Sequence, residues 1–250
     1  MMDSEPPKQD FEHEPVLLRQ VVESIAAENP KLIMDCTLGG AGHSAALLEA
    51  IPQAHLIGLD RDQTAISVAK KRLSQFGDRV TIVHSSFENA PQVLADLGID
   101  GVDALLADLG VSSHQIDTAD RGFSFRMDGP LDMRMDTSVG QSAAEILEEI
   151  PEKELARIIK VYGEERYSGR VARVIKEANL TTTAELADVI RSVVRKGKDK
   201  LDPATRTFQA IRMLVNGELD QLENLLNAIP NLLNDDGVAA LISFHSLEDR

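Results

Sequence analysis

Three aspartates, Asp35, Asp60 and Asp108, each stand directly after a short apolar run of the sequence. Such runs predict buried strands, and the carboxyl ends of parallel strands meet at one edge of a sheet. Carboxylates at that edge can accept hydrogen bonds from hydroxyl and amino groups, at about 1.5–3 kcal/mol each. A glycine-rich turn, Gly39–Gly42, follows the first aspartate and lets a ligand approach the backbone. The pattern predicts a cofactor site.

Two cofactors fit this turn. Residues 40–45 match the dinucleotide fingerprint G-x-G-x-x-G/A, and Asp60 lies 20 residues after Gly40, where a ribose-binding acid is expected. The same residues are also a variant of the S-adenosylmethionine (SAM) loop, in which an acid ends the first strand and glycines follow. Asp35 would repel a pyrophosphate, which favours SAM over NAD. A nicotinamide-dependent oxidoreductase is the less favoured alternative.

The SAM interpretation gives each residue a role. Asp35 faces the methionine amino group, and the turn from Gly40 to His43 opens a helix whose N-terminus favours the methionine carboxylate. Asp60 holds the ribose hydroxyls, and Phe87 covers the adenine, where stacking contributes about 1–3 kcal/mol. In the alternative, the aspartates only form turns and Phe87 belongs to the core.

The elements that position these residues alternate between strands and helices. The predicted strands are residues 32–35, 56–60, 80–87, 102–108 and 238–244. The predicted helices are residues 15–27, 43–50, 62–75 (with Asp62 as N-cap) and 207–228, the last broken only by Gly217. This alternation predicts an α/β fold with a parallel sheet covered on both faces.

The middle of the chain has a different pattern. From about Ser112 to Pro203 we find no good strand. Four helices are predicted there, at residues 143–150, 152–162, 169–178 and 183–194, the last with a capped start formed by residues 181–183 and Glu185. We therefore expect residues 1–112 and 204–250 to form the cofactor-binding core, and residues 113–203 to form an inserted helical subdomain that recognises the substrate.

The net charge of −15 argues against a nucleic-acid partner when the chain is taken as a whole. However, residues 121–212 hold 17 Lys and Arg against 15 Asp and Glu, whereas the remainder holds 9 against 26. Basic groups are therefore concentrated in the central segment. That concentration allows a polyanionic partner, although a solvated helix end and loop would have the same composition.

Several signals bear on location and metals. The single cysteine, Cys36, allows no intrachain disulfide and fits a reducing compartment. The polar, acidic start, Met1–Glu14, is no signal peptide, and no apolar run is long enough to span a bilayer. We expect a cytoplasmic protein with no membrane contact. No metal is expected, because the six histidines and one cysteine lack ligand spacing.

Longer strings along the chain resemble one family. These are Asp108–Ser113, Arg121–Phe125, Asp128–Asp136, Tyr162–Arg166, Pro203–Ala210 and Ser243–Arg250, with His13–Leu17 near the start. They resemble the bacterial small-subunit rRNA cytosine-N4 methyltransferases (RsmH, or MraW), over nearly the whole chain. The resemblance implies a class I SAM-dependent methyltransferase, with a Rossmann-like, mostly parallel sheet and an inserted all-helical subdomain. It implies methyl transfer to N4 of a cytidine in the decoding centre of 16S rRNA.

The resemblance also implies site residues. The family's SAM-binding positions fall on Ala41, Gly42, His43, Asp60, Phe87, Asp108 and Gln115. Ala41 stands where many members have glycine, so we expect a negative φ at this position. The implied partner is 16S rRNA or the assembling 30S subunit, and a homodimer is left open.

For catalysis, Asp108 lies at the strand end where an acceptor for the N4 protons or the SAM amino group is needed, and His245 would assist proton loss. A backbone hydrogen bond is the alternative role for His245. The candidates for RNA contact are Arg121, Arg126, Arg134, Arg166, Arg206 and Arg212. Their alternative is internal ion pairing with the acidic residues interleaved among them.

Family members continue past Arg250 and add at least one more strand. The chain is therefore expected to be a fragment of a longer product, or a shortened SAM- or RNA-binding relative without turnover. In either case the predicted strand at residues 238–244 would be an exposed sheet edge.

Overall fold

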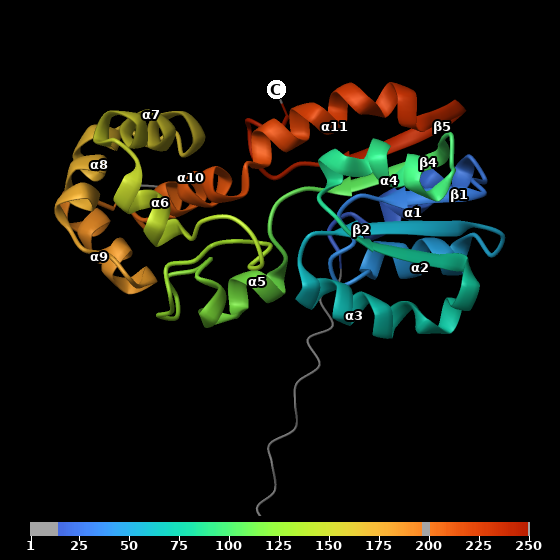
Figure 1. Ribbon diagram of the computed structural model, residues 1–250, viewed down its shortest axis with the longest axis horizontal. Helices are drawn as coiled ribbons and strands as arrows, with labels where there is room; N and C mark the ends of the chain where they lie inside the picture. The colour runs from blue at the N-terminus through green and yellow to red at the C-terminus, as the bar shows by residue number, and fades with distance from the viewer. Residues whose placement is uncertain (1–14, 197–200, 250) are drawn as a thin grey trace, which may run out of the picture.

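The computed structural model describes residues 15–196 and 201–249, which contain a five-stranded parallel sheet in the order β3-β2-β1-β4-β5 (Figure 1). The strands are β1 (Leu32–Asp35), β2 (His55–Asp60), β3 (Val80–His84), β4 (Val102–Asp108) and β5 (Leu233–Ile242). Every neighbouring pair is parallel. The predicted α/β class is therefore confirmed.

Successive side chains of each strand supply two separate apolar cores, because they point to opposite faces of the sheet. Ile33 and Leu106 pack with the helices of one face, whereas Met34 and Leu105 pack with those of the other. The first face is covered by α1 (Leu18–Ala27), α2 (Gly42–Ala50) and α3 (Gln63–Leu73). The second is covered by α4 (Ala90–Leu97) and α11 (Glu218–Leu232).

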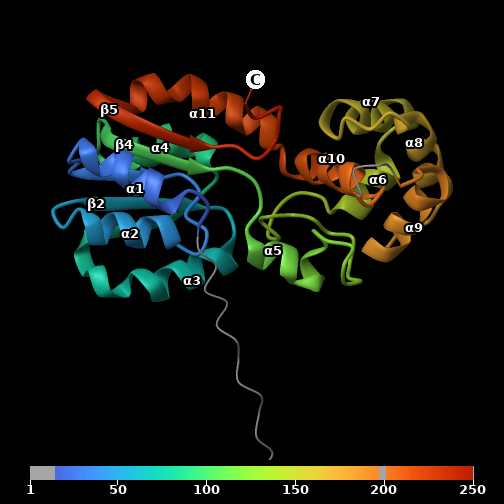
Figure 2. The same cartoon turned by 180° about the vertical axis from the view of Figure 1, so that it is seen from behind.

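A third apolar core lies beside the sheet rather than on it (Figure 2). Its helices are α6 (Ala143–Glu149), α7 (Glu152–Tyr162), α8 (Ser168–Glu177), α9 (Thr183–Val193) and α10 (Thr205–Asn216). The four helices predicted in the middle of the chain are confirmed to within one residue. The predicted cap is confirmed too, since Thr182 and Glu185 form a reciprocal capping box. One short helix there, α5 (Ser113–Asp117), was not predicted.

The expected single helix over residues 207–228 is wrong. Gly217 adopts a left-handed conformation, with φ 58°, and separates α10 from α11. The two helices belong to different cores: Phe208 and Ile211 of α10 are buried in the helical core, and Leu222 and Leu225 of α11 are buried against the sheet. By packing, the helical region therefore includes α10.

Strand β5 begins earlier than predicted. Its register against β4 shifts from Val102–Leu233 to Ala104–Val238, so residues 234–237 form a bulge within the strand. Asn234 Nδ2 donates to Asp103 Oδ1 at 2.7 Å and anchors the bulge. No described helix is long and apolar enough to cross a membrane.

Candidate active site

The three predicted aspartates end adjacent strands, as the sequence indicates. Asp35, at the end of β1, is only 2% exposed. Its Oδ2 accepts from Ser44 Oγ at 2.6 Å and its Oδ1 from the Thr37 N–H at 3.1 Å. Burial raises the pKa of Asp35. This carboxyl ties the end of β1 to the glycine turn and to the first turn of α2.

Asp60, at the end of β2, is only partly buried. Its Oδ2 accepts from the Gly39 N–H and its Oδ1 from the Asp62 N–H, both at 2.7 Å. Burial raises the pKa of Asp60, and the charges of Asp62 and Asp35 raise it further. Because each carboxylate oxygen has two acceptor sites, Asp60 retains capacity for a ligand.

The glycine turn has two left-handed residues, Gly39 with φ 51° and Ala41 with φ 59°. The expectation of a negative φ at Ala41 is therefore wrong. This conformation costs alanine about 1–2 kcal/mol, but the Ala41 methyl group is fully buried in the core, which offsets about 0.8 kcal/mol. At Gly42, an added Cβ would lie 2.4 Å from Pro15 Cγ, so the residues before α1 can pack here only against glycine.

Asp108, at the end of β4, is joined to the same turn. Its backbone N–H donates to Thr37 Oγ1 at 2.6 Å, and its Oδ2 lies 3.7 Å from His43 Nδ1. His43 is itself buried, with Nε2 3.0 Å from the Val16 carbonyl oxygen. The Asp108 side chain is 27% exposed. It is thus a half-buried carboxyl held beside an imidazole at the sheet edge.

Two further predicted cofactor residues lie around this edge. Phe87 begins a short 3-10 turn, Phe87–Asn89, after β3 ends at His84, and it packs partly against the core of the α4 and α11 face. Gln115 is buried in α5, where Nε2 donates to Asp62 Oδ2 at 2.9 Å. Gln115 is therefore linked to the end of β2 by its hydrogen bond to Asp62.

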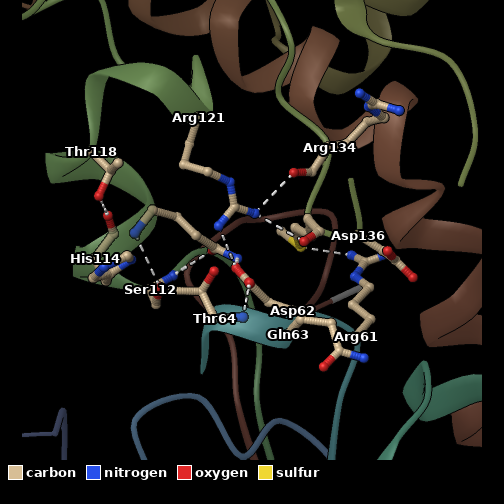
Figure 3. A network of polar contacts seen from close by, with 12 residues as sticks. Arg61, Asp62, Gln63, Thr64, Ser112, His114, Thr118, Arg121, Arg134 and Asp136 are labelled. Atoms are coloured by element: carbon tan, nitrogen blue, oxygen red, sulfur yellow. Dashed lines mark hydrogen bonds and ion pairs between the residues drawn. The ribbon is translucent and has the colours of Figure 1, made fainter. Parts of the chain in front are cut away.

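Asp62 is also the partner of Arg121 (Figure 3). Arg121 Nη1 lies 2.7 Å from Asp62 Oδ2, and Nη2 donates to the carbonyls of Arg134 and Met135 at 3.1 and 2.9 Å. A cavity of about 100 Å³ lies beside this network and is lined by residues 62–64, Arg121 and residues 135–138. The network joins the end of β2 to the loop before α6.

Arg61 is a site residue that sequence reasoning missed. Its Nη1 donates to the Asn216 carbonyl at 2.9 Å and to Gln221 Oε1 at 3.1 Å. Its Nη2 lies 2.8 Å from Met135 Sδ, a contact that Figure 3 draws. The only local signal is its place between Asp60 and Asp62. Its partners are 74 to 160 residues away in the chain, so spacing could not reveal them.

The remaining candidate arginines differ in their surroundings. Arg134 pairs with Asp132 through two hydrogen bonds of 2.8 and 2.7 Å, and Arg212 pairs with Glu218 through two of 2.9 and 2.7 Å. With Arg121, these residues show the internal ion pairing expected as the alternative to RNA contact. The other three candidates differ in exposure: Arg126 and Arg166 are exposed, and Arg206 is partly buried.

His245 lies in the turn that follows β5, three residues after Ile242, the register partner of Asp108. The ring Nδ1 of His245 accepts from the backbone N–H of Leu247 at 3.1 Å, and the backbone N–H of His245 donates to Glu248 Oε2 at 3.2 Å. The predicted backbone contact is thus present, and Nε2 is the ring nitrogen left for another partner. Among the described residues, no three His, Cys, Asp or Glu side chains form a group suited to a metal ion.

A parallel sheet in this order, with acidic side chains and a glycine turn at its carboxyl edge, is the Rossmann-like fold of class I methyltransferases. Residues 10–250 match the sequence profile of the MraW methylase family, and the chain belongs to that family. The resemblance stated from the sequence is confirmed.

Curated relatives agree with this assignment. The ribosomal RNA small subunit methyltransferase H of Geobacter sp. (strain M21) is 51% identical over 97% of this chain and 80% of that protein. The protein of the same name from Sorangium cellulosum (strain So ce56) is 51% identical over 96% and 77% of the two chains. That of Heliobacterium modesticaldum (strain ATCC 51547 / Ice1) is 47% identical over 96% and 79%.

Proposed function

We propose that this protein transfers the methyl group of SAM to the exocyclic N4 of a cytidine in small-subunit rRNA. One observation carries the proposal: Asp60 and Asp108, both partly exposed, end β2 and β4, the two neighbours of β1, and are hydrogen-bonded to the turn that follows β1. The family and the names of the relatives support the rRNA substrate. They do not favour an oxidoreductase.

The residues present fit SAM, a cationic cofactor with ribose hydroxyls and a carboxylate. Asp60 keeps acceptor capacity for the hydroxyls, and the N–H groups of the first turn of α2 favour the carboxylate. Phe87 would cover the adenine with the exposed part of its ring. When bound, the cofactor supplies an electrophilic methyl group, so the task of the protein is alignment.

Asp108 has the chemistry that the acceptor amine needs. The N4 lone pair is delocalised into the cytosine ring, and a carboxylate that accepts an N4 hydrogen orients that lone pair for attack. As the nitrogen–carbon bond forms, the bond between the methyl carbon and the sulfonium sulfur breaks, and the sulfur keeps the electron pair as a neutral thioether. N4 gives up one proton, which passes to Asp108 or to His245 and then to water. Since a cytidine in structured RNA is stacked, it must be splayed out before it reaches this edge.

The arginines divide into two groups in this proposal. Arg126 and Arg166, which are exposed, contact RNA phosphates, and the partly buried Arg206 is a further candidate for such a contact. Arg121, Arg134 and Arg212 shape the loops through their ion pairs. Phosphate contacts require that RNA affinity fall steeply with salt, and a flat response would contradict them. We place the reaction in the cytoplasm, on 16S rRNA, either free or in the assembling 30S subunit.

The test is transfer of labelled methyl from SAM to small subunits, and separately to naked rRNA, that lack the modification. We expect transfer by the 250-residue chain, and loss of most activity with near-normal SAM affinity in Asp108→Ala. Asp78→Ala is the matched control, because Asp78 is exposed and precedes β3 at the opposite edge of the sheet. Binding of SAM without any transfer would instead identify an inactive relative. Full activity in Asp108→Ala would remove Asp108 from the scheme.

A further inference from the structure

An exposed aromatic side chain stands at the start of α8. Tyr167 is 47% exposed. Arg170, one helical turn later, places its guanidinium 5.5 Å from the centre of the Tyr167 ring. Among the residues that the structure describes, no carboxylate lies within ion-pair distance of Arg166 or Arg170. The Tyr167 ring and the Arg170 guanidinium form one exposed surface, which we call the Tyr167 surface, and the exposed Arg166 directly precedes the ring in the chain.

Two contacts hold the backbone beneath this surface in place. Glu165 is only 4% exposed, and its Oε1 accepts the Tyr167 N–H at 2.7 Å. Gly163, two residues before Glu165, packs so closely on α10 that an added Cβ would lie 2.4 Å from the Arg206 carbonyl oxygen. An exposed ring on a fixed backbone loses little conformational entropy when it binds, which suits it to contact a partner.

The Tyr167 surface also lies near the catalytic edge. Ser246 Oγ donates to Glu164 Oε1 at 3.1 Å, which joins the turn between α7 and α8 to the turn that follows β5. That second turn contains His245 and continues the strand paired with the end of β4, where Asp108 lies. A substrate held at Asp108 would therefore have its flanking parts close to Tyr167.

The basic residues around Tyr167 indicate an anionic partner. Residues 157–176 hold six Lys and Arg against two Glu, within a chain whose net charge is −15. Two of the six, Arg157 and Arg173, pair with Glu154 and Glu152, which lie before that range. An aromatic ring beside guanidinium groups is the combination that binds unpaired nucleic acid, since the ring stacks on a base and the cations meet the phosphates. An acidic polypeptide would use the charges but not the ring.

We propose that the Tyr167 surface binds unpaired RNA next to the methylated cytidine, with Tyr167 stacked on one base and Arg170 and Arg166 on the adjoining phosphates. The inference rests on the proposed function for the identity of the RNA, but the binding itself can be tested without turnover.

The experiment measures the affinity of the full chain for a labelled single-stranded RNA and for the same strand in a duplex. We expect Tyr167→Ala to weaken single-strand binding about 5- to 150-fold, the range that loss of one stacked base produces, while Tyr167→Phe retains it. Arg170→Ala should lower the slope of log affinity against log salt by about 1. Leu97→Ala, which shortens a 42% exposed side chain far from α8, is the control and should bind as the wild type does.

Other outcomes would overturn the proposal. Unchanged RNA affinity in Tyr167→Ala, equal losses for strand and duplex, or equal competition by polyglutamate would each contradict a stacking surface. SAM affinity, measured in parallel, checks that Tyr167→Ala is folded. If the wild type binds RNA through Tyr167 but transfers no methyl group, the surface stands and the proposed reaction fails. If the wild type transfers the methyl group and Tyr167→Ala binds RNA as tightly as the wild type, the proposed reaction stands and the Tyr167 surface fails.

Discussion

Arg121 and Asp62 form a nearly buried ion pair that joins the sheet to the loops in front of the helical region. Their closest atoms, Nη1 and Oδ2, are 2.7 Å apart, and the side chains are 12% and 5% exposed. Gln115 donates to the same carboxylate oxygen. Burial by itself would raise the pKa of Asp62, but the hydrogen bonds from Gln115 and Arg121 lower it overall. The carboxyl is therefore charged at neutral pH.

Removal of the guanidinium should destabilise the protein strongly. We expect Arg121→Ala to lower the free energy of unfolding by about 3–5 kcal/mol, because a buried carboxylate loses its charge partner. Urea unfolding followed by circular dichroism measures the change. Arg157→Ala is the control: its pair with Glu154 is 2.6 Å long but 58% and 44% exposed, so solvent screens it and its loss should cost far less. Similar losses in both variants would show that the buried pair contributes little.

Asp60 should couple pH to stability in the opposite direction to an ordinary ion-paired carboxyl. Its pKa is raised by burial, so the folded protein binds this proton more tightly than the unfolded chain does. Stability from Asp60 is thus gained as pH falls from its raised pKa toward about 4, the ordinary value, and is lost as pH rises. Relative to Asp60→Asn, the wild type should become more stable as pH falls through that window. Parallel pH profiles of the two proteins would contradict this.

The same variant should bind SAM less well at neutral pH. Asp60→Asn replaces a charged acceptor by a neutral one, and a charged acceptor is worth about 1.5–3 kcal/mol. We expect the dissociation constant for SAM to rise about 10- to 150-fold in calorimetry. Asp78→Asn, with the same change at an exposed position, should bind SAM normally.

Two glycines near α8 should respond oppositely to the same substitution. At Gly163, a Cβ would lie 2.4 Å from the Arg206 carbonyl oxygen and 2.9 Å from that of Ile159, so Gly163→Ala should cost about 1–3 kcal/mol of stability through overpacking. At Gly169, no heavy atom lies within 4 Å of an added Cβ, and Gly169→Ala should stabilise α8 by up to about 1 kcal/mol. Thermal unfolding distinguishes the two. Equal shifts would refute the close approach of α10 to this turn.

Cys36 should be chemically inert in the folded protein. The thiol is 2% exposed, and burial, together with the charge of Asp35, raises its pKa. Since the thiolate is the reactive form, alkylation by iodoacetamide should be slow in native buffer and fast in urea. Rapid modification without loss of structure would show that the end of β1 opens readily.

The sequence predicted the elements whose signals are local. Apolar runs that end at Asp35, Asp60 and Asp108 located the strands and placed the carboxylates at one edge. The cap at Thr182 and Glu185 located the start of α9 because both partners lie within one helical turn.

Signals that depend on tertiary contacts were not visible. The early start of β5 was missed, because residues 234–237 are polar and leave the ladder between Leu233 and Val238. The network of Arg61 and Arg121 joins segments far apart in the chain, so no spacing rule could detect it.

The pairing of β4 with β5 has a consequence for the order of folding. Nearly half the chain, including the whole helical region, is synthesised between these two neighbouring strands. Until β5 arrives, the outer edge of β4 has unsatisfied backbone groups, and loop closure over so many residues is slow unless the intervening segment has already become compact. Early formation of the helical region on the nascent chain would shorten that search and limit the time in which β4 can pair with another molecule.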